Sequence, residues 1–172
     1  MILTQYITEN RDAFILEVEN VSSRLGINPN WLMAVMFKES RLNHRAVNPT
    51  SGATGLIQFM PSTAGGLGTT ITLLREMSNV EQLYWVHKYL KPYAYKFKSY
   101  TDVYLAVFFP AAIGKPQDYV LQTSSLSAGL IANQNKALDT NNNNQLTVAE
   151  VEAWALRGFD ANTVKELKKK AL

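Results

Sequence analysis

The chain has 172 residues, and 47% of them are hydrophobic, which is enough for the core of one domain or of one domain with a small appendage. It holds no cysteine, which excludes disulfides and thiolate metal sites, and it has no apolar run of about 18 residues that could cross a membrane. The net charge of +3 comes without a basic stripe interleaved with aromatic residues, which argues against a nucleic-acid partner.

The first part of the chain predicts two helices. Apolar residues recur at helical spacing over residues 7–25, and Gly26 is a typical helix end. Asn28 and Pro29 then favour the start of a second helix, because asparagine is a good N-cap and proline is tolerated at the first helical position. The following sequence, WLMAVMFKESR, is apolar on nearly every face, which indicates a central, buried helix.

The rest of the chain predicts a mainly α fold with few strands. Turn formers and short β-like pieces occupy residues 43–60. A capping box at Ser78–Glu81 begins a helix that Pro92 ends, and Thr101–Asp102 is expected to cap the next one. Residues 115–126 predict a loop. Further helices are expected near residues 127–138, 148–157 and 162–171.

Glu39 lies at the C-terminal end of an apolar stripe on the second helix. The other members of that stripe are Leu32, Val35 and Met36. Burial and the negative end of the helix dipole both disfavour an ionised carboxylate there, so both raise its pKa. A carboxyl that keeps its proton near neutral pH is what a general acid needs to break a glycosidic bond. The alternative is an ordinary ion pair at a helix end, with Lys38, Arg41 or Arg45.

The segment after this helix carries groups that suit a neutral sugar. Gly52 and Gly55 permit tight backbone turns, and Leu56, Gln58 and Met60 alternate after them. The Gln58 amide offers both a hydrogen-bond donor and an acceptor. We therefore expect this segment to line a groove for a glycan.

From residue 39 to residue 64 the sequence ESRLNHRAVNPTSGATGLIQFMPSTA resembles the soluble lytic transglycosylase domain, which is related to goose-type lysozyme. The family pattern is Glu-Ser, then Ala-x-Ser, then Gly-Ala-x-Gly-Leu-Met-Gln-Ile-Met-Pro-x-Thr-Ala. The later stretch SNVEQLYWVHKYLKPY is similar to the family's Asn-Ile … Gly … Tyr-Leu helix. The resemblance covers about residues 25–115, and it implies a lysozyme-like helical domain that cleaves peptidoglycan.

The resemblance also implies roles for residues in the matching block. Glu39 is implied as the catalytic acid and base, with Ser40 orienting it or supporting the local turn. The residues implied to bind the glycan are Gln58, Phe59 and Met60, together with Asn48, which stands where the family has serine.

One family block differs in this chain. The family's Ala-Tyr-Asn-Ala-Gly block reads LAVFFPAA here, so Phe108 replaces the tyrosine. Tyr104 lies one helical turn earlier and could point the same way, and we count both residues as candidates for the glycan site. The alternative for both is packing in the core.

The implied reaction uses a single carboxyl. Glu39 protonates the leaving oxygen of the β-1,4 bond after N-acetylmuramic acid, the substrate's N-acetyl group assists, and the sugar's 6-hydroxyl closes a 1,6-anhydro ring. A glycosidase normally needs two carboxylates, and the motif blocks hold no second one. The alternatives are a hydrolytic muramidase, with Glu76 or Glu81 placing a water, and a non-catalytic wall-binding or virion structural protein that keeps the fold.

Residues 139–150, DTNNNNQLTVAE, follow the ligand order of an EF-hand loop. The six ligand positions hold Asp139, Asn141, Asn143, Gln145, Thr147 and Glu150. Asn144 takes the place of the usual glycine at position 6, where asparagine is the best substitute for a left-handed conformation. Only two ligands are charged, which predicts a structural Ca²⁺ site of weak affinity, about 10⁻⁴–10⁻³ M. The alternative is a metal-free turn.

We therefore expect a catalytic domain over residues 1–126 and an EF-hand-like helical appendage over residues 127–172, packed on it. The expected partner is the peptidoglycan glycan strand, with no catalytic cofactor, and the protein is expected to be a monomer. The sequence starts without a basic segment and apolar run of a secretory signal. Action in the cell wall or periplasm would then require phage-associated or specialised delivery.

Overall fold

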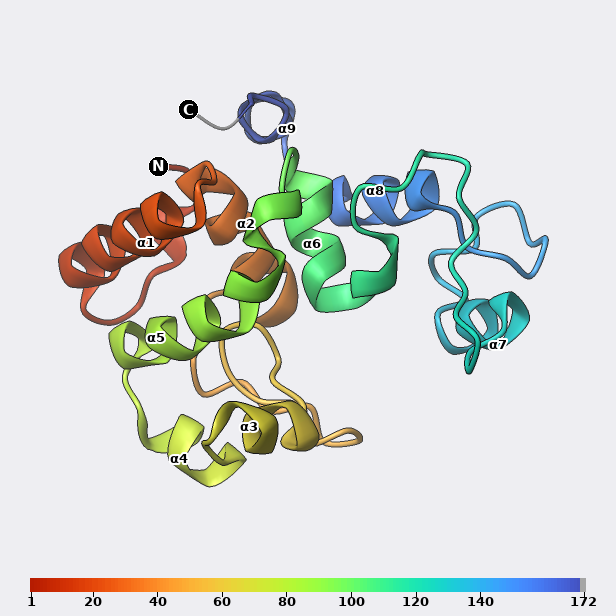
Figure 1. Cartoon of the computed structure of the whole chain (residues 1–172). Coiled ribbons are helices and arrows are strands. Elements are labelled where there is room, and N and C mark those ends of the chain that lie inside the picture. Colours follow the sequence, from red (N-terminus) through yellow and green to blue (C-terminus); the bar gives the residue numbers. More distant parts are fainter. Residues whose placement is uncertain (171–172) are drawn as a thin grey trace. The chain divides into compact units, whose positions relative to one another are not determined.

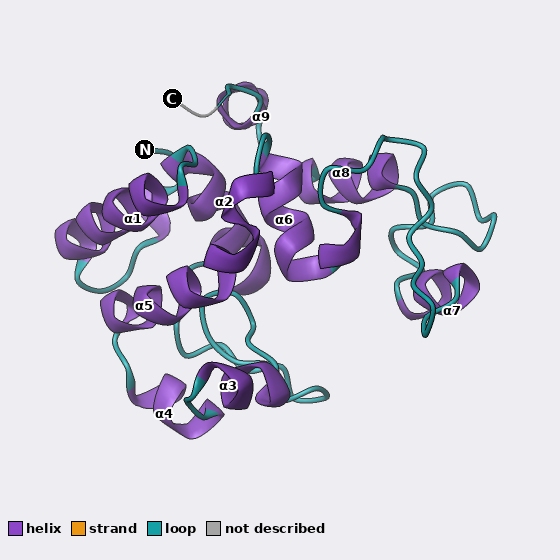
Figure 2. Ribbon diagram, viewed as in Figure 1, coloured by secondary structure: helices purple, strands orange, loops and turns teal. Residues whose placement is uncertain are grey.

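The computed structural model describes residues 1–170, and it is almost entirely helical (Figures 1 and 2), which confirms the predicted mainly α class. The chain forms two compact units, one of residues 1–95 with the chain end from Lys169, and one of residues 96–168. The domain boundary that we expect between residues 126 and 127 stays a prediction.

The first unit is built around a buried helix. Its helices are α1 (Arg11–Leu25), α2 (Pro29–Ser40), α3 (Pro61–Leu67), α4 (Ile71–Glu76) and α5 (Asn79–Leu90), with 3₁₀ turns at Thr4–Tyr6 and Lys91–Lys96. Helix α1 contacts both α2 and α5, and α3 contacts α5. Every residue of α2 from Trp31 to Phe37 is buried, as its all-round apolar sequence predicts.

The predicted helix boundaries of the first unit are largely confirmed. Gly26 ends α1 with a φ of 66°, a left-handed conformation that glycine adopts without a steric penalty. The Asn28 side chain caps α2 by accepting a hydrogen bond from the backbone N–H of Asn30 at 2.9 Å. Ser78 and Glu81 form the expected capping box of α5.

The second unit contains the remaining helices. They are α6 (Tyr100–Phe108), α7 (Ala128–Gln134), α8 (Val148–Leu156) and α9 (Ala161–Leu167), with a 3₁₀ turn at Pro110–Ala112. Helix α6 contacts α8, and the Tyr100 hydroxyl donates a hydrogen bond to the Ala155 carbonyl at 3.1 Å. An isolated antiparallel bridge joins Val120, which precedes α7, to Thr147, the residue before α8.

Several elements differ from the sequence prediction. Ser99, not Thr101, caps α6, because the Ser99 hydroxyl accepts from the backbone N–H of Asp102 at 3.2 Å. Helices α3 and α4 were not predicted, since α3 contains two glycines and α4 has only 6 residues. The helix predicted at 127–138 ends at Gln134, and the last residue of the range 162–171 lies outside the described residues.

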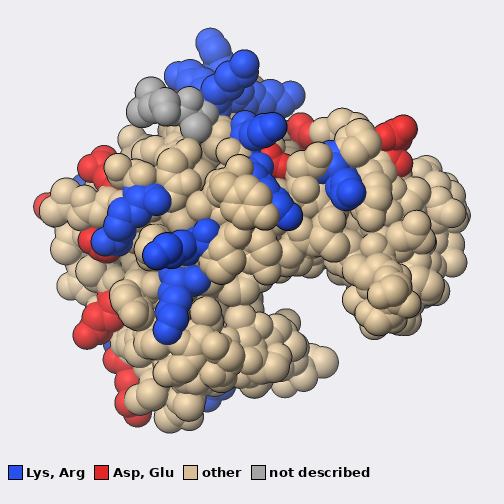
Figure 3. All heavy atoms as spheres, viewed as in Figure 1, with Lys and Arg blue, Asp and Glu red and all other residues tan. Residues whose placement is uncertain are grey.

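The surface carries few charges. Figure 3 shows Lys and Arg side chains in blue and Asp and Glu side chains in red on a surface that is mostly uncharged. Within residues 1–170, no helix combines the length and the apolar character needed to cross a membrane.

Candidate active site

Glu39 lies half-buried in the last turn of α2. Burial raises the pKa of its carboxyl to about 7, against a smaller opposite effect of the Lys38 ammonium. This is the direction that the sequence predicts from an apolar stripe ending in a glutamate. A carboxyl with such a pKa is about half-protonated at pH 7 and largely protonated at mildly acidic pH, so it can donate a proton.

The two arginines considered as partners of Glu39 are engaged elsewhere. The Arg41 guanidinium lies over the Phe37 ring, 4.5 Å from its centroid. Arg45 lies 3.9 Å from a carboxylate oxygen of Glu9. Glu39 belongs to none of the ion pairs found among residues 1–170, so an arginine ion pair does not explain its position.

Ser40 joins the end of α2 to the loop that follows. It is 7% exposed, and its hydroxyl lies 3.0 Å from the carbonyl oxygens of both Met36 and Leu56. The backbone then turns sharply, because Arg41 and Leu42 both adopt the left-handed conformation, with φ of 56° and 63°. Two such residues in succession need support from surrounding contacts. Ser40 supplies one of them.

The loop over residues 46–59 folds as a compact double turn. Reciprocal backbone hydrogen bonds join Thr54 and Phe59, at 3.0 and 2.8 Å. Gln58 adopts a left-handed φ of 52°, and its side-chain amide donates to the carbonyls of Gly55 at 3.2 Å and Ala46 at 3.4 Å. Both amide hydrogens of Gln58 therefore hold the loop, and its carbonyl oxygen is the group left to meet a ligand.

The other residues implied to bind the glycan differ in exposure. Asn48 is exposed, and its side chain accepts hydrogen bonds from the backbone N–H groups of Thr50 and Ser51. Met60 is 44% exposed, whereas Phe59 is 2% exposed. The left-handed turn at Gln58 breaks the alternation that the sequence predicted for this segment. Contact of these three residues with a glycan stays a prediction.

Tyr89, on α5, is a residue that sequence reasoning missed. Burial, with smaller effects of Tyr93 and of Glu39, raises the pKa of its hydroxyl to about 12. The Glu39 carboxyl is thus within electrostatic range of Tyr89, and the Tyr89 and Phe59 rings form an edge-to-face pair with 6.3 Å between centroids. Tyr89 is a phenol that keeps its proton at neutral pH. The Tyr-Leu pair of the family-like helix was the available signal.

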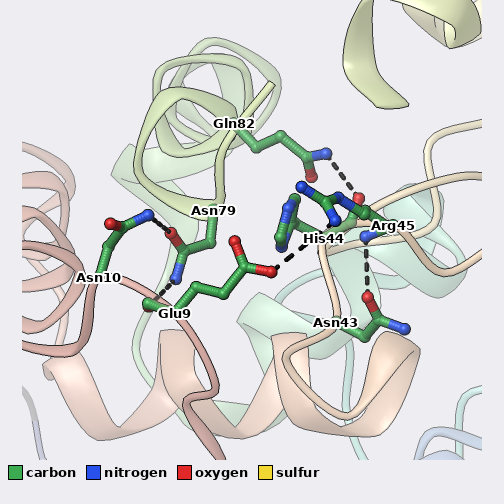
Figure 4. Close-up of polar contacts among 7 residues, drawn as sticks. All are labelled: Glu9, Asn10, Asn43, His44, Arg45, Asn79 and Gln82. Carbon is green, nitrogen blue, oxygen red and sulfur yellow. Dashed lines mark hydrogen bonds and ion pairs between the residues drawn. The ribbon is translucent and has the colours of Figure 1, made fainter. Parts of the chain in front are cut away.

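Gln82, about two helical turns before Tyr89 on α5, was also missed. It is fully buried, and its side-chain oxygen accepts from the backbone N–H of Leu56 at 3.0 Å. Its amide nitrogen donates to the carbonyls of His44 and Leu74, each at 2.7 Å. Figure 4 shows Gln82 reaching toward the backbone of His44. A buried glutamine on a helix has no sequence signature for this role.

Tyr104 and Phe108 lie in the second unit, on α6. Their rings stack at 6.1 Å between centroids with an interplanar angle of 16°, so they share one helix face as their spacing predicts. Tyr104 is 4% exposed and Phe108 is half-buried. Their contact with a glycan stays a prediction.

The glutamates considered for water activation differ from Glu39. A Glu81 carboxylate oxygen accepts from the backbone N–H and the hydroxyl of Ser78, both at 2.8 Å. These hydrogen bonds lower the pKa of Glu81, so it is a helix-capping carboxylate. Glu76 is exposed at the end of α4.

The loop over residues 139–150 is held by side-chain to backbone hydrogen bonds, and its binding of calcium stays a prediction. The Asp139 carboxylate accepts from the backbone N–H groups of Asn143 and Asn144, at 3.1 and 2.9 Å. Asn144 adopts a left-handed φ of 61°, as position 6 requires. Leu146 is fully buried, and its carbonyl accepts from the backbone N–H of Leu121 at 2.8 Å.

The donors of this loop are all oxygen atoms, which are the ligands that Ca²⁺ prefers. Glu150 is 9% exposed, and its two carboxylate oxygens accept from the Asn141 amide at 3.0 Å and from Thr147 at 2.9 Å. In the described part of the chain, no group of three or more His, Cys, Asp or Glu is placed to hold a metal ion. A site here would depend on amide and carbonyl oxygens beside Asp139 and Glu150.

A comparison with protein families supplies an independent finding. A family model described as "Transglycosylase SLT domain" matches residues 18–107, which is more than half of the chain. The match includes Glu39, the loop with Gln58, and the helix with Gln82 and Tyr89. No solved structure matches the chain.

Proposed function

Because the chain belongs to the family of SLT transglycosylase domains, which cleave peptidoglycan, we propose that it is a lytic transglycosylase whose single catalytic residue is Glu39. The observation that carries this proposal is the half-buried Glu39 carboxyl, whose burial raises its pKa to about 7. The next residue, Ser40, hydrogen-bonds Leu56 in the loop over residues 46–59. Such a group can donate a proton to a glycosidic oxygen and then take one back.

The proposed reaction returns Glu39 to its starting state. The carboxyl gives its proton to the oxygen that leaves carbon 1 of N-acetylmuramic acid, and the acetamido oxygen of that sugar attacks the carbon as the bond breaks. The carboxylate then takes the proton of the 6-hydroxyl, whose oxygen displaces the acetamido oxygen from carbon 1. The products are a free 4-hydroxyl on N-acetylglucosamine and a 1,6-anhydro sugar, and no water is consumed.

Three features support this route over hydrolysis and over binding alone. Glu81 is engaged with Ser78, and Glu76 is exposed, so neither resembles a base held beside Glu39. Tyr89 lies within electrostatic range of Glu39, whose charge contributes to the raised pKa of the Tyr89 hydroxyl, so Tyr89 stays a neutral phenol at neutral pH and adds no second charged group to the site. A protein that only bound the wall would have no need of a buried acid.

Mass spectrometry of muropeptides released from purified sacculi tests the proposal. The wild type should release 1,6-anhydro products, and Glu39→Gln should release none while still binding sacculi. Products with a reducing end, which carry one more water, would instead identify a hydrolytic muramidase. If wild type and Glu39→Gln both bind sacculi and release nothing, the protein is a binding protein.

We also propose that the loop over residues 139–150 binds Ca²⁺. The support is its all-oxygen donor set and the left-handed Asn144 at position 6. The ligands would be the side chains of Asp139, Asn141, Asn143, Thr147 and Glu150 and the carbonyl of Gln145. Bound calcium would hold α7 and α8 together through the loop that joins them.

Calcium titration by calorimetry tests this second proposal. We expect a dissociation constant of about 10⁻⁴–10⁻³ M, because only two of the ligands carry a charge. At a calcium concentration ten times that constant, the free energy of unfolding should rise by about 1.4 kcal/mol. Glu150→Gln should abolish the heat of binding. If the wild type binds no calcium at about 10 mM, which is ten times the upper limit of this range, the proposal is wrong.

A further inference from the structure

The side chain of Gln82 uses all of its hydrogen-bonding hydrogens inside the first unit. Its two amide hydrogens are divided between the carbonyls of His44 and Leu74, and its oxygen holds the N–H of Leu56. The three partners lie 38, 8 and 26 residues away along the chain. Since the residue is fully buried, no water replaces a partner that is lost, and the amide is held in one orientation.

The loop backbone approaches this amide so closely that only glycine fits beside it. Gly55 has a φ of 83°, and a Cβ atom at this position would lie 2.5 Å from the Gln82 side-chain oxygen. That distance is far inside van der Waals contact, and the oxygen is not free to retreat because it holds Leu56. Gly55 and Gln82 therefore form a matched pair that sets how near the loop lies to α5.

Leu56 connects Gln82 to the end of α2 through two hydrogen bonds. Its N–H donates to Gln82, and its carbonyl lies 3.0 Å from the hydroxyl of Ser40, the residue after Glu39. One residue of the loop thus links the buried amide on α5 to the last turn of α2.

We propose that Gln82 is a positioning residue for the catalytic carboxyl: by holding Leu56 and Ser40, it keeps Glu39 shielded from water and therefore able to act as an acid. The inference rests on the proposed function of Glu39. It differs from a purely structural role of Gln82, which would change the stability of the protein but leave the acidity of Glu39 as it is.

Two substitutions on α5 separate these roles. Gln82→Met removes all three hydrogen bonds with little change in side-chain volume. Asn79→Leu is the matched control, because Asn79 is 3% exposed and lies on the same helix. Its side chain donates to the carbonyl of Glu9 at 2.7 Å and accepts from Asn10 at 3.1 Å. Both of these partners lie before α1, and neither lies in the loop over residues 46–59 (Figure 4).

The first readout is the pKa of Glu39, measured by carbon-13 NMR of its carboxyl during a pH titration. In Gln82→Met we expect this pKa to fall by about one unit toward its ordinary value, because the carboxylate becomes better hydrated. In Asn79→Leu it should remain that of the wild type, even where the two variants lose the same amount of thermal stability. An unchanged pKa in folded Gln82→Met, or an equal shift in both variants, would overturn the inference.

The second readout is the release of muropeptides as a function of pH. A fall of about one unit in the pKa of the acid should make the ratio of the cleavage rates at pH 8 and pH 5 about tenfold smaller in Gln82→Met than in the wild type. If Gln82→Met does not fold, Gly55→Ala decides the question by the same NMR titration, because its added Cβ atom would lie 2.5 Å from the Gln82 side-chain oxygen. We expect the pKa of Glu39 to fall in that variant too, and an unchanged pKa would overturn the inference.

The two proposals fail in different ways. If Glu39→Gln cleaves sacculi as well as the wild type does, the proposed catalytic role of Glu39 is wrong, whereas the NMR titration still reports whether Gln82 controls its pKa. If the wild type cleaves, Glu39→Gln does not, and Gln82→Met keeps the wild-type pKa and pH profile, only the inference about Gln82 is wrong.

Discussion

At the scale of single residues, the protonation of Glu39 couples activity to stability. Its folded-state pKa of about 7 lies above the ordinary value of 4.5, so its contribution to stability is fully present below pH 4.5 and is lost as the pH rises through 7. Glu39→Gln removes this loss because an amide does not ionise. The variant should be more stable than the wild type at pH 8, by up to about 3 kcal/mol, and similar to it at pH 4. Urea denaturation at the two pH values measures the difference, and an equal effect at both would contradict the assignment.

His44 makes the stability of the protein depend on pH in the acidic range. It is 3% exposed, its Nε2 atom has no hydrogen-bond partner, and burial lowers its pKa, with Glu9 opposing and Arg45 reinforcing the shift. The unfolded chain therefore takes up a proton at this residue before the folded chain does, so stability falls as the pH drops below 6.5. His44→Leu should lose less stability than the wild type between pH 6.5 and 5. The comparison isolates His44 from His87, whose pKa is also lowered. Parallel losses in the two proteins would exclude His44 as the cause.

At the scale of elements, the ends of the helices depend on specific caps. The structure places the cap of α6 at Ser99, where the sequence suggested Thr101. Ser99→Ala should lower the free energy of unfolding by about 1 kcal/mol, since it removes an N-cap. Thr101→Val, which keeps the shape of the side chain, serves as the control and should cost clearly less. Thermal denaturation of the two variants distinguishes them, and a larger loss for Thr101→Val would place the cap as the sequence suggested.

The sequence predicts those helix ends that are set by a few neighbouring residues. The stop at Gly26, the cap at Asn28 and the capping box at Ser78 each depend on residues within one helical turn, and all three are confirmed. Helices α3 and α4 have weak helix propensity or are short, so packing and not local preference forms them.

At the scale of the whole molecule, the family match spans residues 18–107 and so includes part of both compact units. The proposed calcium loop lies within the second unit alone. We therefore expect calcium to slow amide hydrogen exchange between residues 119 and 150, where the loop pairs with Val120 and joins α7 to α8, and to leave residues 44–58 unchanged. Hydrogen exchange with calcium and with a chelator provides the measurement. Equal protection of both segments would show that the effect of calcium is not confined to the loop.

The sequence by itself determined the helical class, the family resemblance that the comparison confirms, and the direction in which the pKa of Glu39 shifts. These follow from periodicity, short motifs and the end of one helix, all of which are local properties of the chain. The tertiary structure alone decided that Tyr89 lies within electrostatic range of Glu39, that Gln58 turns left-handed, and that Gln82 holds the loop. Each depends on backbone and side-chain groups brought together by folding. The hydrogen bonds of Gln82 to Leu56 and His44 cross 26 and 38 residues of sequence, a separation over which no local pattern carries information.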